Sequence, residues 1–193
     1  MQVHKLEDKN KLFESVLTFG NFDGIHRGHA YIIDKLISIS KKEDLKSVLI
    51  TFEPHTTSTL RNDNNFKIIT PFNKKISVLE RFNLDVTCKI NFNKKFSELS
   101  AATFIDIIIK KYNPKIILIG YDNYFGHKKE GSYKYLSRND KYSSIKIINI
   151  NQFKYKNINV KSSLIKDFIM KSDISNVNNL INRQFSIDGK VIK

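Results

Sequence analysis

The sequence predicts an α/β fold, in which a parallel sheet of about five strands is flanked by helices. Short apolar, β-branched runs alternate along the 193 residues with segments of helical spacing, which is the pattern of a parallel sheet covered by helices. Polar segments that contain Gly, Pro or His follow several of these runs, at the end of the sheet where such folds bind ligands. The length suits one domain with a buried core.

Each expected element follows from a local pattern. The expected strands are Ser15–Phe19, Ser47–Phe52, Val86–Ile90, Lys115–Ile119 and Ile145–Ile150. The expected helices are Gly28–Lys42, Asn73–Phe82, Ala101–Tyr112, Ser132–Leu136, Ser163–Met170 and Ile174–Ile181. Ser100 is a candidate cap for the third helix, and Pro114 ends that helix before the next strand. The polar segment Thr56–Asn65 is expected to be a mobile loop.

Composition excludes several classes of protein. No apolar run approaches the roughly 20 residues that span a bilayer, and the first residues lack the apolar segment of a signal peptide. Cys88 is the single cysteine, so a disulfide framework and a thiolate metal cluster are excluded. A cytoplasmic protein without a membrane partner is therefore expected.

The net charge of +14 does not indicate a nucleic-acid partner. Arginines are few, and the lysines that supply most of the charge are spread along the whole chain rather than gathered in one segment. Nucleic-acid binders more often concentrate basic residues on one face and use arginine to contact phosphates. The charge is better suited to attracting small anionic ligands.

The segment from Gly20 to His29 carries the clearest functional signal. It lies between an expected strand and an expected helix, and it contains three glycines, one aspartate and two histidines. Because His26 and His29 are three residues apart at the helix start, both imidazoles are expected to point to one side. Free backbone N–H groups and the positive end of the helix dipole lie beside them. A nucleotide phosphate is the natural ligand of such a place.

Three other segments are expected at the same end of the sheet. They are Glu53-Pro54-His55 after the second strand, Gly120–Gly126 after the fourth, and Lys161–Lys166 beyond the last. Since the carboxyl ends of parallel strands share one edge of the sheet, these segments predict a single active site.

These segments, taken in order, resemble a known family. Gly-x-Phe-Asp-Gly-x-His-x-Gly-His at 20–29 is similar to the nucleotidyltransferase signature, in the version of the FMN adenylyltransferase (FAD synthetase) module of bacterial bifunctional riboflavin kinase/FAD synthetases. Thr51–His55, Ile69–Lys75, Gly120–Gly126 and Lys161–Lys166 resemble four further motifs of that module. The departures from its pattern are Thr56, Asn123, Lys161, Ser163 and Lys166. The resemblance implies a Rossmann-like nucleotidyltransferase fold.

The resemblance also implies a reaction, the transfer of AMP from ATP to FMN, which gives FAD and pyrophosphate. The implied catalytic residues are His26, His29 and Lys166. The implied ATP-binding residues are Gly20, Phe22, Asp23, Gly24, Gly28, Ser162 and Ser163. The implied flavin-binding residues are Phe52, Pro54, His55, Asp122 and Phe125. Mg²⁺ is expected as the cofactor, held mainly by phosphates and water, with Asp122 as the candidate protein contact.

Each of these roles has a structural alternative at the level of the residues. Asp23 fits a turn-stabilising role as well as a phosphate-side role, and Ser162 and Ser163 fit simple helix caps. Phe52 and Phe125 fit an ordinary core, and Asp122 fits a structural hydrogen bond. Two other functions also remain open. One is a transferase of the same fold that acts on pantetheine phosphate, nicotinate nucleotide or a phosphorylated alcohol, and the other is a decayed, non-catalytic nucleotide- or flavin-binding module.

The resemblance implies one domain followed by a short C-terminal segment. Residues 1–183 are expected to form the adenylyltransferase domain, and residues 184–193 resemble the start of the linker and first strand that lead into a riboflavin kinase domain. The motifs of that kinase are not found in the chain, so riboflavin phosphorylation is not expected, and a separate riboflavin kinase would supply FMN.

Overall fold

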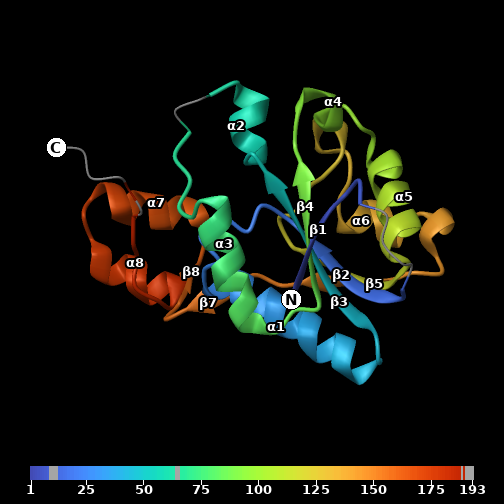
Figure 1. Ribbon diagram of the computed structural model, residues 1–193, viewed down its shortest axis with the longest axis horizontal. Coiled ribbons are helices and arrows are strands. Elements are labelled where there is room, and N and C mark those ends of the chain that lie inside the picture. The colour runs from blue at the N-terminus through green and yellow to red at the C-terminus, as the bar shows by residue number, and fades with distance from the viewer. Residues whose placement is uncertain (9–12, 64–65, 188, 190–193) are drawn as a thin grey trace.

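The computed structural model describes residues 1–8, 13–63, 66–187 and 189. Its centre is a six-stranded, wholly parallel sheet with the strand order β1-β4-β3-β2-β5-β6 (Figure 1). The strands are β1 (Gln2–Lys5), β2 (Ser15–Phe19), β3 (Lys46–Glu53), β4 (Val86–Asn91), β5 (Pro114–Gly120) and β6 (Lys146–Ile150). The chain order reverses between β2 and β5, and ligands of open parallel sheets bind at such a switch point.

Helices cover both faces of the sheet. One face packs on α5 (Ala101–Tyr112) and α6 (Tyr133–Ser137), and the other on α1 (Arg27–Lys42) and α3 (Phe72–Leu79). Alternate residues of β2 therefore enter different cores: Leu17 joins the α5 side and Val16 the α1 side, and both are fully buried. Burial on both sides explains why the strands read as nearly continuous apolar runs. The α/β class and the parallel sheet are confirmed.

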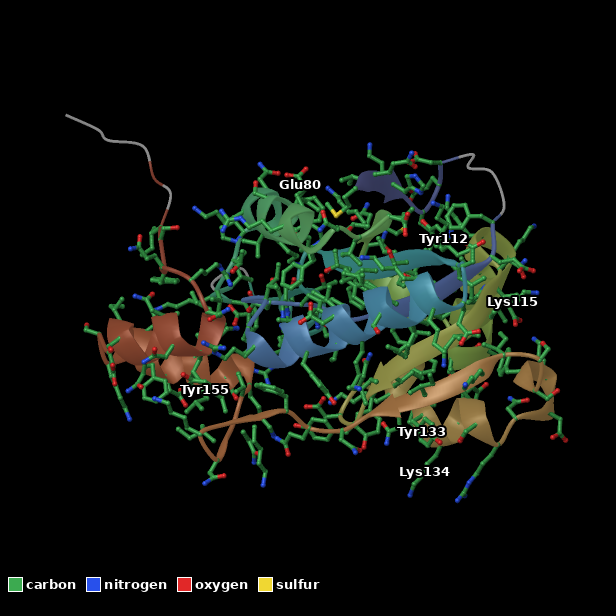
Figure 2. The ribbon with its side chains drawn as sticks, turned by 90° about the horizontal axis from the view of Figure 1, so that it is seen from below. Glu80, Tyr112, Lys115, Tyr133, Lys134 and Tyr155 are labelled. Carbon is green, nitrogen blue, oxygen red and sulfur yellow. The ribbon has the colours of Figure 1, made fainter. Side chains whose placement is uncertain are left out.

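A third apolar cluster lies at one end of the molecule. It is formed by α7 (Ser162–Met170) and α8 (Ile174–Ile181), which pack on Ile69 and Val160. Figure 2 shows this helix pair, with Tyr155 beside it, at the opposite end of the molecule from Tyr133 and Lys134 of α6. A short antiparallel hairpin, β7 (Lys154–Tyr155) and β8 (Ile158–Asn159), precedes the pair.

Two predictions about local structure were incomplete or wrong. Strand β1 was not predicted, because only Val3 of its four residues is apolar and it pairs at the edge of the sheet with β4. The loop expected at Thr56–Asn65 is wrong for its first part, where α2 (Thr56–Arg61) forms. The Nδ1 atom of His55 accepts a hydrogen bond from the Thr57 N–H and caps this helix. Asn64 and Asn65 lie outside the described residues.

The remaining elements are short. They are α4 (Lys94–Ser97), with its N-cap at Asn93, and the 3₁₀ turns η1 (Glu80–Phe82), η2 (His127–Lys129) and η3 (Asp140–Tyr142). Residues 184–187, where the start of a further strand was expected, adopt no regular secondary structure, and residues 188 and 190–193 lie outside the described part of the chain.

Candidate functional site

A cavity of about 350 Å³ opens at the switch point between β2 and β5. This volume lies within the range of small-molecule sites. Its walls come from the turn after β2, the start of α1, the ends of β5 and β6, and the start of α7. The residues that line it include Phe19, Gly20, Phe22, Asp23, His26, Gly28, His29, Asp122, Lys161, Ser162 and Ser163.

The two histidines of the turn lie face to face in this cavity. Their ring centroids are 3.6 Å apart and the rings are nearly parallel. His26 is the N-cap of α1, and its Nδ1 accepts a hydrogen bond of 3.2 Å from the His29 backbone N–H. Because that bond occupies Nδ1, the neutral imidazole of His26 carries its proton on Nε2, which is the atom it can offer to a ligand. Gly28 leaves room for the His26 ring, since a Cβ there would make a tight contact of 3.2 Å with it.

Both imidazoles are neutral near pH 7. Burial lowers the pKa of His26 to about 4, despite the opposing charge of Asp23. Burial also lowers the pKa of His29 well below 6.5, and the charges of His26, Lys75 and Arg183 act in the same direction. The pair therefore provides uncharged hydrogen-bond donors rather than imidazolium ions.

Asp23 joins three separate segments at the edge of the cavity. Its Oδ1 accepts hydrogen bonds from the backbone N–H groups of Ile69 and Thr70, at 2.9 and 3.1 Å. Its Oδ2 lies 3.3 Å from Nζ of Lys166, and its backbone carbonyl accepts a hydrogen bond from the Ser162 hydroxyl. Asp23 thus stabilises the turn and also holds the basic residue that was predicted to contact phosphate.

Lys166 has a second contact that the sequence did not indicate. Its Nζ lies 4.1 Å from the centroid of the Phe66 ring, in cation–π geometry. The other neighbour of that ring is His55, at 4.7 Å between centroids. Lys166 is not among the described residues that line the cavity, and its ammonium is paired with Asp23, which does line it.

The N-terminus of α7 faces the cavity without a side-chain cap. Lys161 is the N-cap residue and makes no capping hydrogen bond within the described part of the chain, and the first turn holds no acidic residue. Ser162 donates to Asp23 instead of capping. The N-termini of α1 and α7 therefore converge on one cavity, where free N–H groups and helix dipoles favour an anion.

A buried lysine supports the turn from below. Nζ of Lys75 donates to the backbone carbonyl of Asn21 at 2.8 Å and to the hydroxyl of Thr51 at 3.2 Å. Only 4% of Lys75 is exposed, and burial lowers its pKa. The sequence carried a signal for this residue, because Lys75 shares helical spacing with Val78 and Leu79, and a lysine on an apolar helix face is unusual.

A second, smaller cavity of about 50 Å³ lies on the α5 side of the sheet. Phe52, Phe96, Phe104 and Phe125 line it, together with Ser97, Leu99 and Gly126. Phe19 lies between the two cavities: it lines the large one, and its ring packs edge-on against Phe104 and Phe125 at 5.2 and 5.1 Å. The aromatic cluster and the histidine pair are therefore neighbours at one end of the sheet.

Comparison with known proteins identifies the family. Residues 8–164 match the family model described as FAD synthetase. The chain belongs to the FAD synthetase family. It is 38% identical to the bifunctional riboflavin kinase/FMN adenylyltransferase of Buchnera aphidicola subsp. Schizaphis graminum, over 98% of this chain and 61% of that protein. It is 26% identical to the protein of the same name from Escherichia coli K12, over 92% of this chain and 57% of that one. The chain thus spans about three-fifths of the length of these relatives.

A solved structure supports the fold of this FAD synthetase family member. The crystal structure titled macrolide-efflux protein from Streptococcus pneumoniae superposes with a TM-score of 0.83 at 22% identity, covering 95% of this chain and 60% of that one. At this level of identity the likeness concerns the fold alone.

Most of the predicted site residues of this FAD synthetase domain are brought together. Of the predicted ATP-binding and catalytic residues, those that line the large cavity are Gly20, Phe22, Asp23, His26, Gly28, His29, Ser162 and Ser163. Gly24 lies outside the described lining and packs on Ile69, and its φ of +87° is a conformation that glycine adopts readily.

The predicted flavin-binding residues are divided between different places. Phe52 and Phe125 line the small cavity and Asp122 lines the large one. Among the described lining residues of both cavities, Pro54 and His55 are absent: Pro54 is exposed, and His55 caps α2.

Two features are absent from the described residues. No three His, Cys, Asp or Glu side chains gather there in a way that would hold a metal ion. Within the same part of the chain, no helix combines the length and the apolar character that crossing a membrane requires.

Proposed function

We propose that this domain transfers the AMP group of ATP to the phosphate of FMN, producing FAD and pyrophosphate. The observation that carries the proposal is the convergence of two helix N-termini, of which that of α7 has no side-chain cap, and a neutral, stacked histidine pair on one cavity. Such an arrangement suits a polyphosphate, because the donors are fixed before the ligand arrives. The family membership and the names of the relatives support FMN as the acceptor.

The proposed chemistry needs no protein nucleophile. An oxygen of the FMN phosphate attacks the α-phosphorus of ATP, a new P–O bond forms, and the bond to the departing pyrophosphate breaks. The contribution of the protein is to hold two anions together and to stabilise the negative charge that develops on the α-phosphoryl oxygens. His26 and His29 donate hydrogen bonds to those oxygens, and Lys166, held by Asp23 at the edge of the cavity, adds positive charge to the site.

ATP binding is assigned to the large cavity. Gly20, Phe22, Asp23, Gly24, Gly28, Ser162 and Ser163 form or support its phosphate side. In this assignment Asp23 acts through the groups it holds, because its carboxylate is already engaged by Ile69, Thr70 and Lys166.

Mg²⁺ is proposed as the cofactor that accompanies ATP and shields the phosphate charge. The residues present fit an ion held mainly by phosphates and water, because only one of the two carboxylates that line the cavity is available to contact it. Asp23 is committed to protein partners, whereas Asp122 is exposed at the cavity wall and is the carboxylate that can contact a phosphate-bound ion.

The flavin ring is assigned to the aromatic side of the site, at Phe52 and Phe125. The small cavity, at about 50 Å³, has room for one or two waters rather than three fused rings. Flavin entry therefore requires the segment around Phe96 and Leu99 to move away from Phe125. Pro54 and His55 complete the proposed flavin side at the end of β3, and Asp122 orients the ribityl chain.

The supply of FMN is also part of the proposal. The relatives are named for riboflavin kinase as well as for FMN adenylyltransferase. We infer that a riboflavin kinase, acting in the cytoplasm together with this domain, provides the FMN.

The decisive experiment measures FAD formation from ATP, Mg²⁺ and FMN by the wild type and by His29→Ala. Loss of one fixed donor is expected to lower kcat by about 100- to 1000-fold, while ATP binding weakens much less. Val3→Ala, which alters an exposed side chain of the edge strand β1, is the control and should keep wild-type turnover. Nucleotide binding without FAD formation in the wild type would contradict the proposal, and equal turnover in His29→Ala would remove His29 from the mechanism.

A further inference from the structure

The turn between β2 and α1 holds an unfavourable backbone conformation. Phe22 and Ile25 have φ angles of +48° and +37°, a backbone region that residues other than glycine rarely adopt. Gly24, which lies between them, has a φ of +87°. Backbone of this kind persists only where its surroundings hold it in place. The turn leads directly into His26, so whatever holds the turn also sets the position of the histidine pair.

Arg183 provides such a contact from the far end of the chain. Its Nη2 donates to the carbonyl of Gly24 at 2.6 Å, and its Nη1 donates to the carbonyl of Ile25 at 3.1 Å. The same guanidinium also donates to the carbonyl of Ile181 and to the hydroxyl of Thr70. One planar group thus binds two consecutive carbonyls of the turn and joins them to α8 and to the segment that Asp23 contacts.

The charge of Arg183 points to the same site. Within the described part of the chain it forms no ion pair with a carboxylate, so its positive charge is not neutralised there. That charge contributes to lowering the pKa of both His26 and His29, after the larger effect of burial. Arg183 lies beyond residues 8–164, which the family model matches, and it is not among the described lining residues of the cavity.

We propose that Arg183 is a positioning residue for the phosphate-binding turn. It acts through Gly24 and Ile25, fixing the carbonyls that precede His26 and thereby the direction of the imidazole pair. A lysine cannot replace it, because an ammonium lacks the rigid fork that binds two neighbouring carbonyls. The catalytic consequence of this role rests on the proposed adenylyl transfer.

The alternative is that Arg183 only anchors α8 and does not position the turn. A second arginine also anchors α8 but does not contact the turn carbonyls, so it allows the two roles to be distinguished. Arg27 donates to the carbonyl of Asn179 and to the Oδ1 of Asn182, at 2.7 and 2.6 Å, and these bonds tie α8 to α1 without involving the turn carbonyls. Asn182 has a φ of +54°, so Asn182→Gly removes the acceptor and keeps the backbone conformation. This variant is the matched control for loss of an α8 anchor.

The test compares Arg183→Ala, Arg183→Lys and Asn182→Gly for kcat and KM for ATP, alongside thermal unfolding. We expect Arg183→Ala to lose about 10- to 100-fold in kcat, because small displacements of a catalytic group have effects of this size. Arg183→Lys should recover less than half of the loss, Asn182→Gly should keep wild-type kcat, and added methylguanidinium should restore part of the activity of Arg183→Ala. Wild-type kcat in either Arg183 variant, or an equal loss in Asn182→Gly, would overturn the proposal.

A second measurement keeps this test separate from the proposed function. The imidazole C–H resonances of His26 and His29 should shift in Arg183→Lys and stay in place in Asn182→Gly, whether or not the wild type makes FAD. If the wild type forms no FAD, the proposed adenylyl transfer is contradicted. The positioning role of Arg183 is then tested by these resonances alone. If Arg183→Ala does not fold, Arg183→Lys carries the comparison, and unshifted resonances in that variant contradict the proposal.

Discussion

The histidine pair shows how burial sets chemistry at the scale of single residues. A free imidazole is half protonated near pH 6.5, but the enclosed position of His26, against His29 and beside the α1 N-terminus, favours the neutral ring. Neutrality also fixes the proton on Nε2, since Nδ1 accepts the backbone hydrogen bond of His29. Sequence spacing predicts two imidazoles on one side of a helix start, but it does not predict their stacking or their tautomer.

The lowered pKa of His26 makes stability depend on pH. The unfolded chain binds a proton on this ring below about pH 6.5, whereas the folded protein binds it only near pH 4. The free energy of unfolding should therefore fall as the pH is lowered from 6.5 to 4, by up to about 3 kcal/mol for this group. Urea unfolding at several pH values measures the change.

The control for this prediction is His26→Asn. Asparagine is a good N-cap, so the variant keeps an acceptor for the start of α1 and loses the titration. Its stability should vary less steeply between pH 4 and 6.5, and the other histidines whose pKa values are lowered, His4, His29 and His55, should contribute to the dependence that remains. An unchanged slope in His26→Asn would contradict the assignment.

At the scale of elements, α2 shows why some local structure escapes sequence-based prediction. Four of its six residues, at 56–59, are Thr or Ser, which have modest helix propensity. Two long-range bonds hold the helix start, because the Asn21 side chain donates to the Thr56 hydroxyl and accepts from the Thr56 N–H. These contacts join residues 35 positions apart, and no local pattern indicates them.

Asn21→Ala should loosen α2 selectively. Loss of two hydrogen bonds is expected to cost about 1–3 kcal/mol, and amide exchange across Thr56–Arg61 should become faster while exchange in α5 is unchanged. Hydrogen–deuterium exchange read by mass spectrometry measures this. Asn93→Ala is the matched variant, since Asn93 caps α4, and it should affect α4 instead. Faster exchange throughout the domain in Asn21→Ala would argue against a local role.

The sheet and the longer helices, in contrast, could be predicted closely. The predicted strand Ser15–Phe19 has the observed bounds, and so does the helix Ala101–Tyr112 with its cap at Ser100. Both are long, strongly apolar patterns that packing reinforces. The edge strand β1 and the supporting roles of Phe66 and Arg183 could not be predicted in the same way, because they arise from tertiary contacts with distant segments.

At the scale of the whole molecule, Phe19 connects the two sides of the site. It ends β2, lines the large cavity and packs against Phe104 and Phe125 of the aromatic cluster. The side chain of Asn123 donates to the Phe19 carbonyl at 2.6 Å and ties the loop after β5 to the same point. The grouping of motifs at one sheet edge was predictable, but the aromatic contact between the two cavities was not.

Phe19→Ala should therefore affect the stability of the entire domain. Removing a buried phenylalanine ring typically costs about 3–5 kcal/mol, because apolar contact is lost and a cavity is left behind. Denaturant unfolding measures this loss. Phe19→Leu should lose much less, and Tyr124→Ala, at a side chain that is 57% exposed, should stay within about 0.5 kcal/mol of the wild type. Equal losses in Phe19→Ala and Tyr124→Ala would contradict the central place given to Phe19.

The residues that line the cavity come from distant parts of the chain, from Thr18 to Ser163. Arg183, which binds the carbonyls of the turn before α1, follows later still. A ribosome delivers these stretches in order, so a half-synthesised chain displays both histidines before β6 and α7 exist. Such a nascent chain lacks the parts of the cavity wall that β6 and α7 supply. Ligand binding can therefore reinforce only the finished domain, and it offers no help to intermediates that form during translation.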